Sequence, residues 1–270
     1  MITGWRSTLL ALGYNVSTVT PHDRLETFLS KVRPVDCGIE LIRIGSEMDG
    51  GYLVPNDLEG IEYCFSPGVS TLSDFENQLA DAHIKSFLAD YSVDAPPVQR
   101  SEFLFDKKFL GASDRGCYMT LETWKNKYLN GYSGDLILQM DIEGGEFEVI
   151  FNVSGDLLSQ FRIVVIEFHG MNHLLDPFGF EIYSSCFEKL LDKFHVVHIH
   201  PNNCCGSTKT GIFEFPHVME FTFLNKRRAP ALKPQTSFPH KLDRQNLPGK
   251  PLVLPTCWYS DHSASSKHHG

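Results

Sequence analysis

Four carboxylates crowd the stretch that follows one apolar run of the chain. The run 136–140 has the composition of a buried parallel strand, and Gly144-Gly145 then turns the chain sharply. The acids that follow the run are Asp141, Glu143, Glu146 and Glu148. Because their charges repel one another, this crowding is unfavourable unless a cation, a hydroxyl or water lies among them. Open α/β sheets bind ligands at the carboxyl ends of their strands, so we interpret this acidic segment as part of a functional site.

A second group, earlier in the chain, has the outline of a nucleotide site. The expected strand 61–65 ends at Ser66-Pro67-Gly68-Val69, and Asp90 closes the next expected strand, 84–90. A glycine lets the backbone approach a ligand closely, and an acid at the end of the second strand accepts hydrogen bonds from ribose hydroxyls. One glycine does not make a diphosphate-binding GxGxxG loop. A ligand with a ribose but no phosphate fits better, and S-adenosylmethionine is the common one.

The spacing of the apolar residues predicts the alternating strands and helices that position the acidic segment and the nucleotide-type site. We expect strands at 39–44, from 51, 61–65, 84–90, 103–110, 135–140, 162–168, 196–200 and 218–224, and helices at 21–32, 73–83, 120–129, from 146 and at 181–194. Ser73 and Glu76 have the spacing of a capping box at the start of the second helix. We expect a loop between the last two strands. The alternation predicts an α/β fold with a doubly wound sheet and right-handed crossovers.

Composition limits the classes of function. The 270 residues are 42% hydrophobic, which is enough to fill a core, and the net charge of −9 argues against nucleic acid or an anionic membrane as a partner. We expect neither a membrane span nor a secretory signal, because no apolar run approaches 18 residues. The seven cysteines are scattered and odd in number, so we expect reduced thiols and a cytoplasmic protein.

Five short blocks of the sequence resemble FkbM-like methyltransferases. They are Asp49-Gly50-Gly51-Tyr52, Phe65-Ser66-Pro67-Gly68-Val69, Asp141-Ile142-Glu143-Gly144 with Glu146, Ile166-Glu167-Phe168-His169-Gly170 and His200-Pro201-Asn202-Asn203. The resemblance implies a Rossmann-like class I methyltransferase fold with a seven-stranded, mostly parallel sheet. We expect an N-terminal accessory segment (1–60), a methyltransferase domain (61–227) that the resemblance implies, and an extended, Pro-rich basic C-terminal arm (228–270) that its composition indicates and the resemblance does not cover.

The resemblance also implies a reaction, the transfer of a methyl group from S-adenosylmethionine to an oxygen, commonly a hydroxyl of a sugar in a glycan, a lipopolysaccharide or a natural product. The implied cofactor residues are Gly51, Tyr52, Ser66, Gly68, Val69, Asp90 and Tyr91. The implied contacts to the acceptor are Glu143, His200, Asn202 and Asn203. We interpret His195 and His198, on the same expected strand as His200, as packing residues.

The fourth and fifth strands of a class I sheet are neighbours, so we expect Asp141, Glu167 and His169 to converge as the catalytic group. A sugar hydroxyl is a weak nucleophile and needs a base or a metal. In one mechanism, His169 or Asp141 removes the proton directly. In the other, Asp141, Glu167 and His169 hold Mg²⁺ or Mn²⁺, which lowers the pKa of the acceptor.

Two other classes of function share features of this sequence. A nicotinamide-dependent sugar enzyme would use a similar fold, but it should show a diphosphate-binding glycine loop and a Tyr-x-x-x-Lys pair, and the sequence contains neither. A non-catalytic glycan-binding or scaffold protein with a relict methyltransferase fold would keep the same pocket residues. An assay of methyl transfer to a glycan distinguishes an active enzyme from such a non-catalytic protein.

Overall fold

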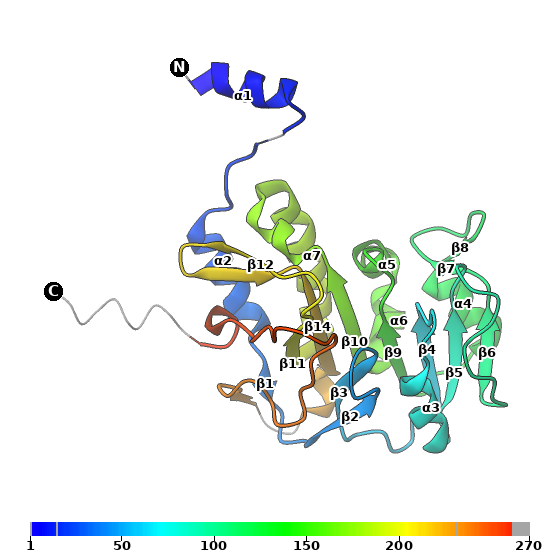
Figure 1. Cartoon of the computed structure of the whole chain (residues 1–270). Helices are drawn as coiled ribbons and strands as arrows, with labels where there is room; N and C mark the ends of the chain where they lie inside the picture. Colours follow the sequence, from blue (N-terminus) through cyan, green and yellow to red (C-terminus); the bar gives the residue numbers. More distant parts are fainter. Residues whose placement is uncertain (1, 15, 230–231, 261–270) are drawn as a thin grey trace.

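The computed structural model describes residues 2–14, 16–229 and 232–260 and contains one central seven-stranded sheet (Figure 1). Across the sheet, the strands run in the order β11 (Phe194–Pro201), β14 (Val218–Asn225), β10 (Phe161–His169), β9 (Leu136–Met140), β4 (Tyr63–Pro67), β5 (Lys85–Ala89) and β6 (Phe103–Asp106). Strand β14 is antiparallel to both of its neighbours, and the other strands are parallel to one another. This order and the single reversed strand confirm the predicted Rossmann-like methyltransferase fold.

Helices cover both faces of the sheet (Figure 1). They are α2 (His22–Val32), α3 (Asp74–Asp81), α4 (Leu121–Leu129), α5 (Glu146–Asn152), α6 (Gly155–Gln160) and α7 (Pro177–Lys193), and α1 (Ile2–Ala11) precedes them. Short 3₁₀ turns lie at η1 (Met171–Leu175), η2 (Lys226–Arg228) and η3 (Thr256–Trp258). Among the described residues, no helix has the length and apolarity that a membrane crossing requires.

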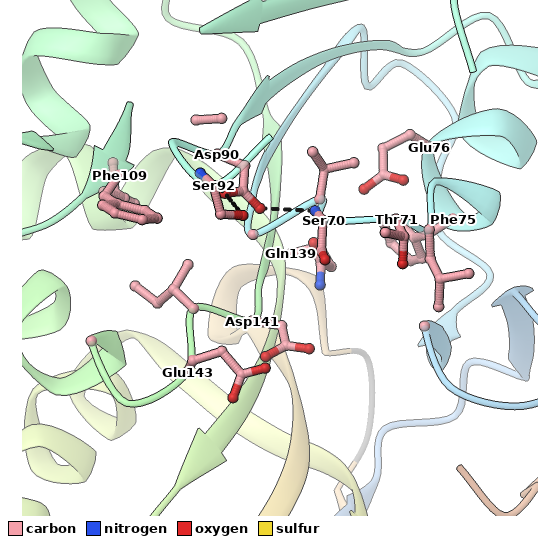
Figure 2. Close-up of a pocket in the computed structure, with 18 of the residues that line it drawn as sticks. Ser70, Thr71, Phe75, Glu76, Asp90, Ser92, Phe109, Gln139, Asp141 and Glu143 are labelled. Atoms are coloured by element: carbon pink, nitrogen blue, oxygen red, sulfur yellow. Dashed lines mark hydrogen bonds between the residues drawn. The ribbon is translucent and has the colours of Figure 1, made fainter. Parts of the chain in front are cut away.

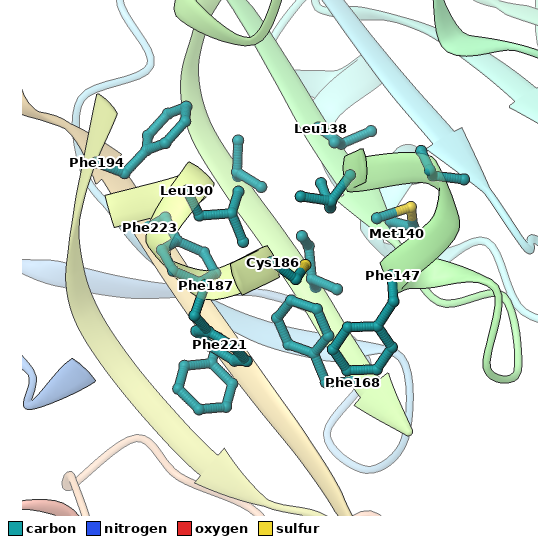
Figure 3. Close-up of a cluster of buried hydrophobic side chains, with 14 of the residues drawn as sticks. Leu138, Met140, Phe147, Phe168, Cys186, Phe187, Leu190, Phe194, Phe221 and Phe223 are labelled. Atoms are coloured by element: carbon teal, nitrogen blue, oxygen red, sulfur yellow. The ribbon is translucent and has the colours of Figure 1, made fainter. Parts of the chain in front are cut away.

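Side chains alternate across each strand and so fill two separate cores. Leu136, Leu138 and Met140 of β9 point into the larger core beneath α2 and α4–α7, whereas Ile137 points into the smaller one. Figure 3 shows the aromatic part of the larger core, where α7 packs on β10 and β14. The smaller core lies beneath α3 and the antiparallel hairpin of β2 (Leu41–Gly45) and β3 (Gly51–Pro55).

Two expected elements differ in the structure. The strand predicted over 103–110 ends at Asp106, and the chain then forms β7 (Phe109–Leu110), which pairs in parallel with β8 (Tyr118–Met119). The segment predicted to be a loop forms the hairpin of β12 (Ser207–Thr210) and β13 (Phe213–Pro216). Its turn lies at Gly211-Ile212, and Phe213 and Phe215 are buried.

The C-terminal segment returns across the domain. β15 (Lys233–Pro234) pairs with β1 (Val35–Asp36). Further on, Trp258 is fully buried, and its Nε1 donates to the carbonyl oxygen of Glu214 at 3.0 Å. Residues 230–231 and 261–270 of the predicted arm lie outside the described residues.

One prediction about the cysteines is wrong. Cys204 and Cys205, adjacent in the loop after β11, form a disulfide, although we expected every cysteine to be reduced. The free cysteines in the described part of the chain are Cys37, Cys64, Cys117, Cys186 and Cys257.

Candidate functional site

A cavity of about 580 Å³ opens at the carboxyl ends of β4, β5 and β9 (Figure 2). Among the residues predicted to bind the cofactor, Tyr52, Gly68, Val69 and Asp90 line this cavity. The wall also includes Ser70, Phe109 and Gln139, which sequence reasoning did not identify. The volume lies within the range of about 300–1,000 Å³ that is typical of small-molecule sites.

Gly68 is required by the backbone that surrounds it. Its φ of +91° lies in the left-handed region, and a Cβ at this position would lie 1.6 Å from the carbonyl oxygen of Asp141. The loop after β4 therefore packs directly against the end of β9. This contact brings the wall of the cavity next to the acidic segment.

Asp90 is held rigidly at the cavity. One carboxylate oxygen accepts a hydrogen bond from the backbone N–H of Ser70 at 2.9 Å, and the other accepts from the N–H and hydroxyl of Ser92 at 2.8 and 2.6 Å. Figure 2 shows these bonds beside the cavity. Because each oxygen carries two lone pairs, the oxygen bound to Ser70 keeps one for a ligand.

The predicted capping box does not form. Ser73 makes no cap hydrogen bond, and its buried Oγ has no partner among the described residues. Glu76 instead turns toward the sheet and contacts the hydroxyl of Ser66 on β4, which also lies 2.6 Å from Oε1 of Gln139. Burial raises the pKa of Glu76 to about 7, and the hydrogen bond from Ser66 opposes this rise. Ser66 is therefore fully buried beneath the cavity and does not line it.

His169, the last residue of β10, lies at the centre of the acidic segment. Its Nδ1 is 3.1 Å from Oε1 of Glu146, and the same oxygen accepts the backbone N–H groups of Ile142 and Gly144, each at 3.1 Å. Glu146 is therefore an acceptor for three groups, and it orients the imidazole through a donated Nδ1–H. The other ring nitrogen, Nε2, is left to face the remaining acids.

Three of those acids surround Nε2 of His169. Oε2 of Glu143 lies at 3.3 Å, Oε1 of Glu167 at 3.7 Å and Oδ1 of Asp141 at 3.9 Å. Glu143 has a φ of +57°, which is uncommon for a residue other than glycine. The tips of β9 and β10 thus share one site, and Asp141 and Glu143 also line the cavity.

Burial and mutual repulsion shift the protonation of this group. The pKa of Asp141 rises to about 7, mainly through burial, and the charges of Glu143 and Glu146 add to the rise, while His169 opposes it. Burial and the nearby Asp141 raise the pKa of Glu167 well above its usual value. Burial lowers the pKa of His169, but the hydrogen bond and the negative charges around it outweigh burial and raise it. Asp141 and Glu167 therefore hold a proton more tightly than exposed carboxyls do.

The ligand set that the structure offers to a metal differs from the predicted one. Asp141, Glu143 and His169 each place a donor atom within 4.8 Å of the other two. Glu167, which we predicted as the third ligand, instead accepts hydrogen bonds from Nδ2 of Asn202 at 3.2 and 3.3 Å. Glu143 is the more accessible ligand, since its side chain is 88% exposed.

Several predicted residues lie away from the cavity. Gly51 packs tightly in the β2–β3 hairpin, and Tyr91 is half-exposed, with its ring against Phe109. Asn203 binds the C-terminal segment, because its side-chain amide donates to the carbonyl oxygen of Leu247 and accepts from its N–H, both at 2.9 Å. Gly51, Tyr91 and Asn203 therefore do not line the cavity, although we predicted that the first two bind the cofactor and the third binds the acceptor.

Two further predicted acceptor residues, His200 and Asn202, lie at the carboxyl end of β11. Asn202 is buried against Glu167, and His200 is buried beside Asp243 of the C-terminal segment. Glu146 belongs to the site through its contact with His169, a role that the sequence analysis did not assign to it. Its position in the run Asp-Ile-Glu-Gly-Gly-Glu was the available signal, because the double glycine folds that run back on itself.

Comparison with known proteins identifies the chemistry of this domain. Residues 126–207 match the family described as Methyltransferase FkbM domain. The chain therefore carries a methyltransferase domain, and the predicted resemblance is confirmed over that range. No curated protein matches the chain.

Solved structures resemble the chain only distantly. One is described as a DNA modification methyltransferase encoded within a prophage (E. coli), with 11% identity and a TM-score of 0.42, and the match covers 68% of this chain and 52% of that one. This chain thus spans about half the length of that protein. Another is a fibrillarin/Nop5p complex, with 13% identity, a TM-score of 0.38, and 72% and 98% of the two chains covered.

Proposed function

We propose that this protein transfers a methyl group from S-adenosylmethionine to a hydroxyl oxygen of a saccharide, in a glycan, a lipopolysaccharide, a nucleotide sugar or a sugar-bearing natural product. The family match supports methyl transfer as the reaction. The observation that carries the oxygen acceptor is the group around His169, in which one imidazole nitrogen faces Asp141, Glu143 and Glu167 within 4 Å. Such a group handles protons and cations, which a hydroxyl nucleophile needs.

The residues around the cavity fit the cofactor. Asp90 keeps a free lone pair suited to a ribose hydroxyl, and Gly68 and Val69 present backbone and apolar surface beside it. Asp141, which also lines the cavity, has a buried Oδ1 without a hydrogen-bond partner among the described residues. When bound, S-adenosylmethionine supplies an electrophilic methyl group on a sulfonium. The protein then has to position the acceptor and remove its proton.

Asp141 is the residue we assign to accept that proton. A general base works best when its pKa lies near the working pH, and the pKa of Asp141 is about 7. His169 is oriented by Glu146 through Nδ1, so that Nε2 faces Asp141 and can share or relay the proton. Burial and the charge of Asp141 raise the pKa of Glu167 well above its usual value, so its carboxyl holds a proton more tightly than an exposed one does.

A divalent ion offers the alternative route, in which Asp141 and His169 would hold the metal and would not take the proton themselves. Asp141, Glu143 and His169 would hold Mg²⁺ or Mn²⁺, whose charge would offset the crowded carboxylates and lower the pKa of the acceptor hydroxyl. Carboxylate oxygens are the ligands that these ions prefer, and one imidazole is compatible with manganese. Direct proton removal by Asp141 and metal assistance thus use the same residues.

The net charge of the chain and the state of its cysteines support our proposals for the acceptor and the compartment. A net charge of −9 disfavours a nucleic-acid acceptor. Apart from the disulfide of the adjacent Cys204 and Cys205, the five cysteines among the described residues are free, which is compatible with a reducing compartment, and we propose the cytoplasm.

Calorimetry and labelled methyl transfer test the proposal. We expect S-adenosylhomocysteine to bind with measurable heat, and we expect labelled methyl to reach at least one member of a panel of glycans and nucleotide sugars. Asp141→Ala and His169→Ala should lower transfer by about a hundredfold or more while keeping the affinity for S-adenosylhomocysteine. His195→Gln, on β11 and outside the site, is the matched control. Absence of cofactor heat, or full transfer by Asp141→Ala, would contradict the assignment.

A further inference from the structure

A second group of metal-binding side chains lies outside the cavity. His198 and His200 are two residues apart on the edge strand β11 and so face the same side of the sheet, and Asp243 comes from the C-terminal segment. One donor atom of each lies within 4.8 Å of the other two. All three side chains are buried, with exposures of 3%, 6% and 6%. None of them lines the cavity described above.

Hydrogen bonds account for only part of this cluster. Nε2 of His198 lies 2.8 Å from Oδ1 of Asp243, which is a hydrogen-bond distance. Nδ1 of His200 lies 3.7 Å from the same oxygen, too far for a hydrogen bond. Nε2 of His200 has no partner among the described residues, although it is buried. Buried polar atoms are nearly always paired in folded proteins, so the imidazole of His200 is not fully satisfied; the ring nitrogen that faces Asp243, and that would face an ion there, is Nδ1.

The distances suit a shared ion. Zinc binds imidazole nitrogen and carboxylate oxygen at about 2.0–2.2 Å, which places tetrahedral ligands about 3.3 Å apart. The distances from Oδ1 of Asp243 to Nε2 of His198 (2.8 Å) and to Nδ1 of His200 (3.7 Å) lie on either side of that spacing. The second carboxylate oxygen of Asp243 accepts the backbone N–H of His240 at 2.7 Å. Outer contacts of this kind orient ligating carboxylates in metal sites.

We propose that His198, His200 and Asp243 bind a zinc ion that fastens the C-terminal segment to the edge of the sheet. Two imidazoles and one carboxylate form a donor set that zinc favours over magnesium or calcium. A site with three protein ligands leaves a fourth position for water. His200 and Asp243 are 43 positions apart in the sequence. An ion bound by both would therefore hold the C-terminal segment against β11 and stabilise the folded protein.

The residues that follow Asp243 contact a residue of the cavity wall, so the ion would also affect the cavity. Nδ2 of Asn246 donates to Glu220 on β14 at 2.6 Å and lies 3.1 Å from Asp49, which lines the cavity. Leu247 is the residue bound by Asn203. Fastening Asp243 therefore holds Asn246 and Leu247 in place.

Metal analysis of the 270-residue protein tests this proposal independently of methyl transfer. We expect one equivalent of zinc per chain by mass spectrometry, and at least a tenfold loss of zinc in Asp243→Asn and His198→Gln. His195→Gln, on the same strand but outside the cluster, should keep its zinc, as should Asp141→Asn, which alters the other group. Cobalt substituted for zinc should give the visible absorption of a tetrahedral site in the wild type and not in Asp243→Asn.

Chelation provides a second test that does not depend on the folding of a variant. Removing zinc from the wild type should lower its Tm by several degrees and speed proteolysis within residues 232–260, and added zinc should reverse both effects. Asp243→Asn should show no response to zinc. The proposal is overturned if the wild type contains no zinc and its Tm does not respond to zinc, or if Asp141→Asn loses the metal while Asp243→Asn retains it.

Discussion

Glu76 should make the stability of this protein depend on pH near neutrality. Its carboxyl is buried beneath α3, and burial raises its pKa from 4.5 to about 7, against the opposing hydrogen bond from Ser66. The folded state therefore binds this proton more tightly than the unfolded state. The resulting stabilisation is fully present below pH 4.5 and is lost as the pH rises through 7. At 1.36 kcal/mol per unit of pKa shift, the free energy of unfolding should fall by about 3 kcal/mol as Glu76 loses its proton.

Glu76→Gln removes the ionisation while keeping the size of the side chain. Relative to the wild type, its free energy of unfolding should rise with pH, by up to about 3 kcal/mol between pH 5 and pH 8. Urea denaturation followed by circular dichroism at several pH values measures this difference. Glu62→Gln, at an exposed position before β4, is the matched control and should follow the wild type. A constant difference between Glu76→Gln and the wild type over this range would refute the reasoning.

Three other substitutions test separate parts of the structure. Trp258→Ala empties a fully buried position and should lower the free energy of unfolding by about 3–5 kcal/mol, measured by denaturation; a loss below about 1 kcal/mol would show that the C-terminal segment does not stabilise the core. Gly68→Ala forces a Cβ against the backbone of Asp141 and should weaken binding of S-adenosylhomocysteine at least about tenfold in calorimetry, or prevent folding; unchanged affinity would contradict the tight packing. Glu146→Gln should lower methyl transfer by about tenfold to a hundredfold and leave cofactor affinity unchanged, because Glu146 contacts His169 and the backbone of residues 142 and 144 and does not line the cavity; equal loss of both would indicate a structural role.

The framework was predictable because its signals are local. Continuous apolar runs such as 136–140 and 162–168 predict buried parallel strands, and both form as β9 and β10. The juxtaposition of Asp141 with His169 followed from the rule that the carboxyl ends of neighbouring parallel strands meet at one edge of the sheet. The hairpin 207–216 also had a local signal, the alternation around Gly211-Ile212, which a strict strand search would have found.

The remaining features depend on contacts between distant segments. The spacing of Ser73 and Glu76 satisfies a capping box, but it does not reveal that Glu76 lies on the face of α3 that packs on the sheet. His198 was interpreted as a packing residue because it lies before the carboxyl end of its strand; its partner, Asp243, is 45 residues further along a segment without regular structure. Only the folded path of that segment brings the carboxylate to the imidazoles.

The reversed strand β14 has a consequence for how this domain can be divided. The region that matches the FkbM family, 126–207, contains β10 and β11 but ends before β14, the strand that lies between them. A fragment cut at those limits would leave the backbone edges of β10 and β11 without the strand that joins them, and unpaired edges of this kind promote aggregation. It would also lack Gly68 and Asp90 from the cavity wall. Expression trials should therefore keep the chain through at least Asn225 and begin before β4.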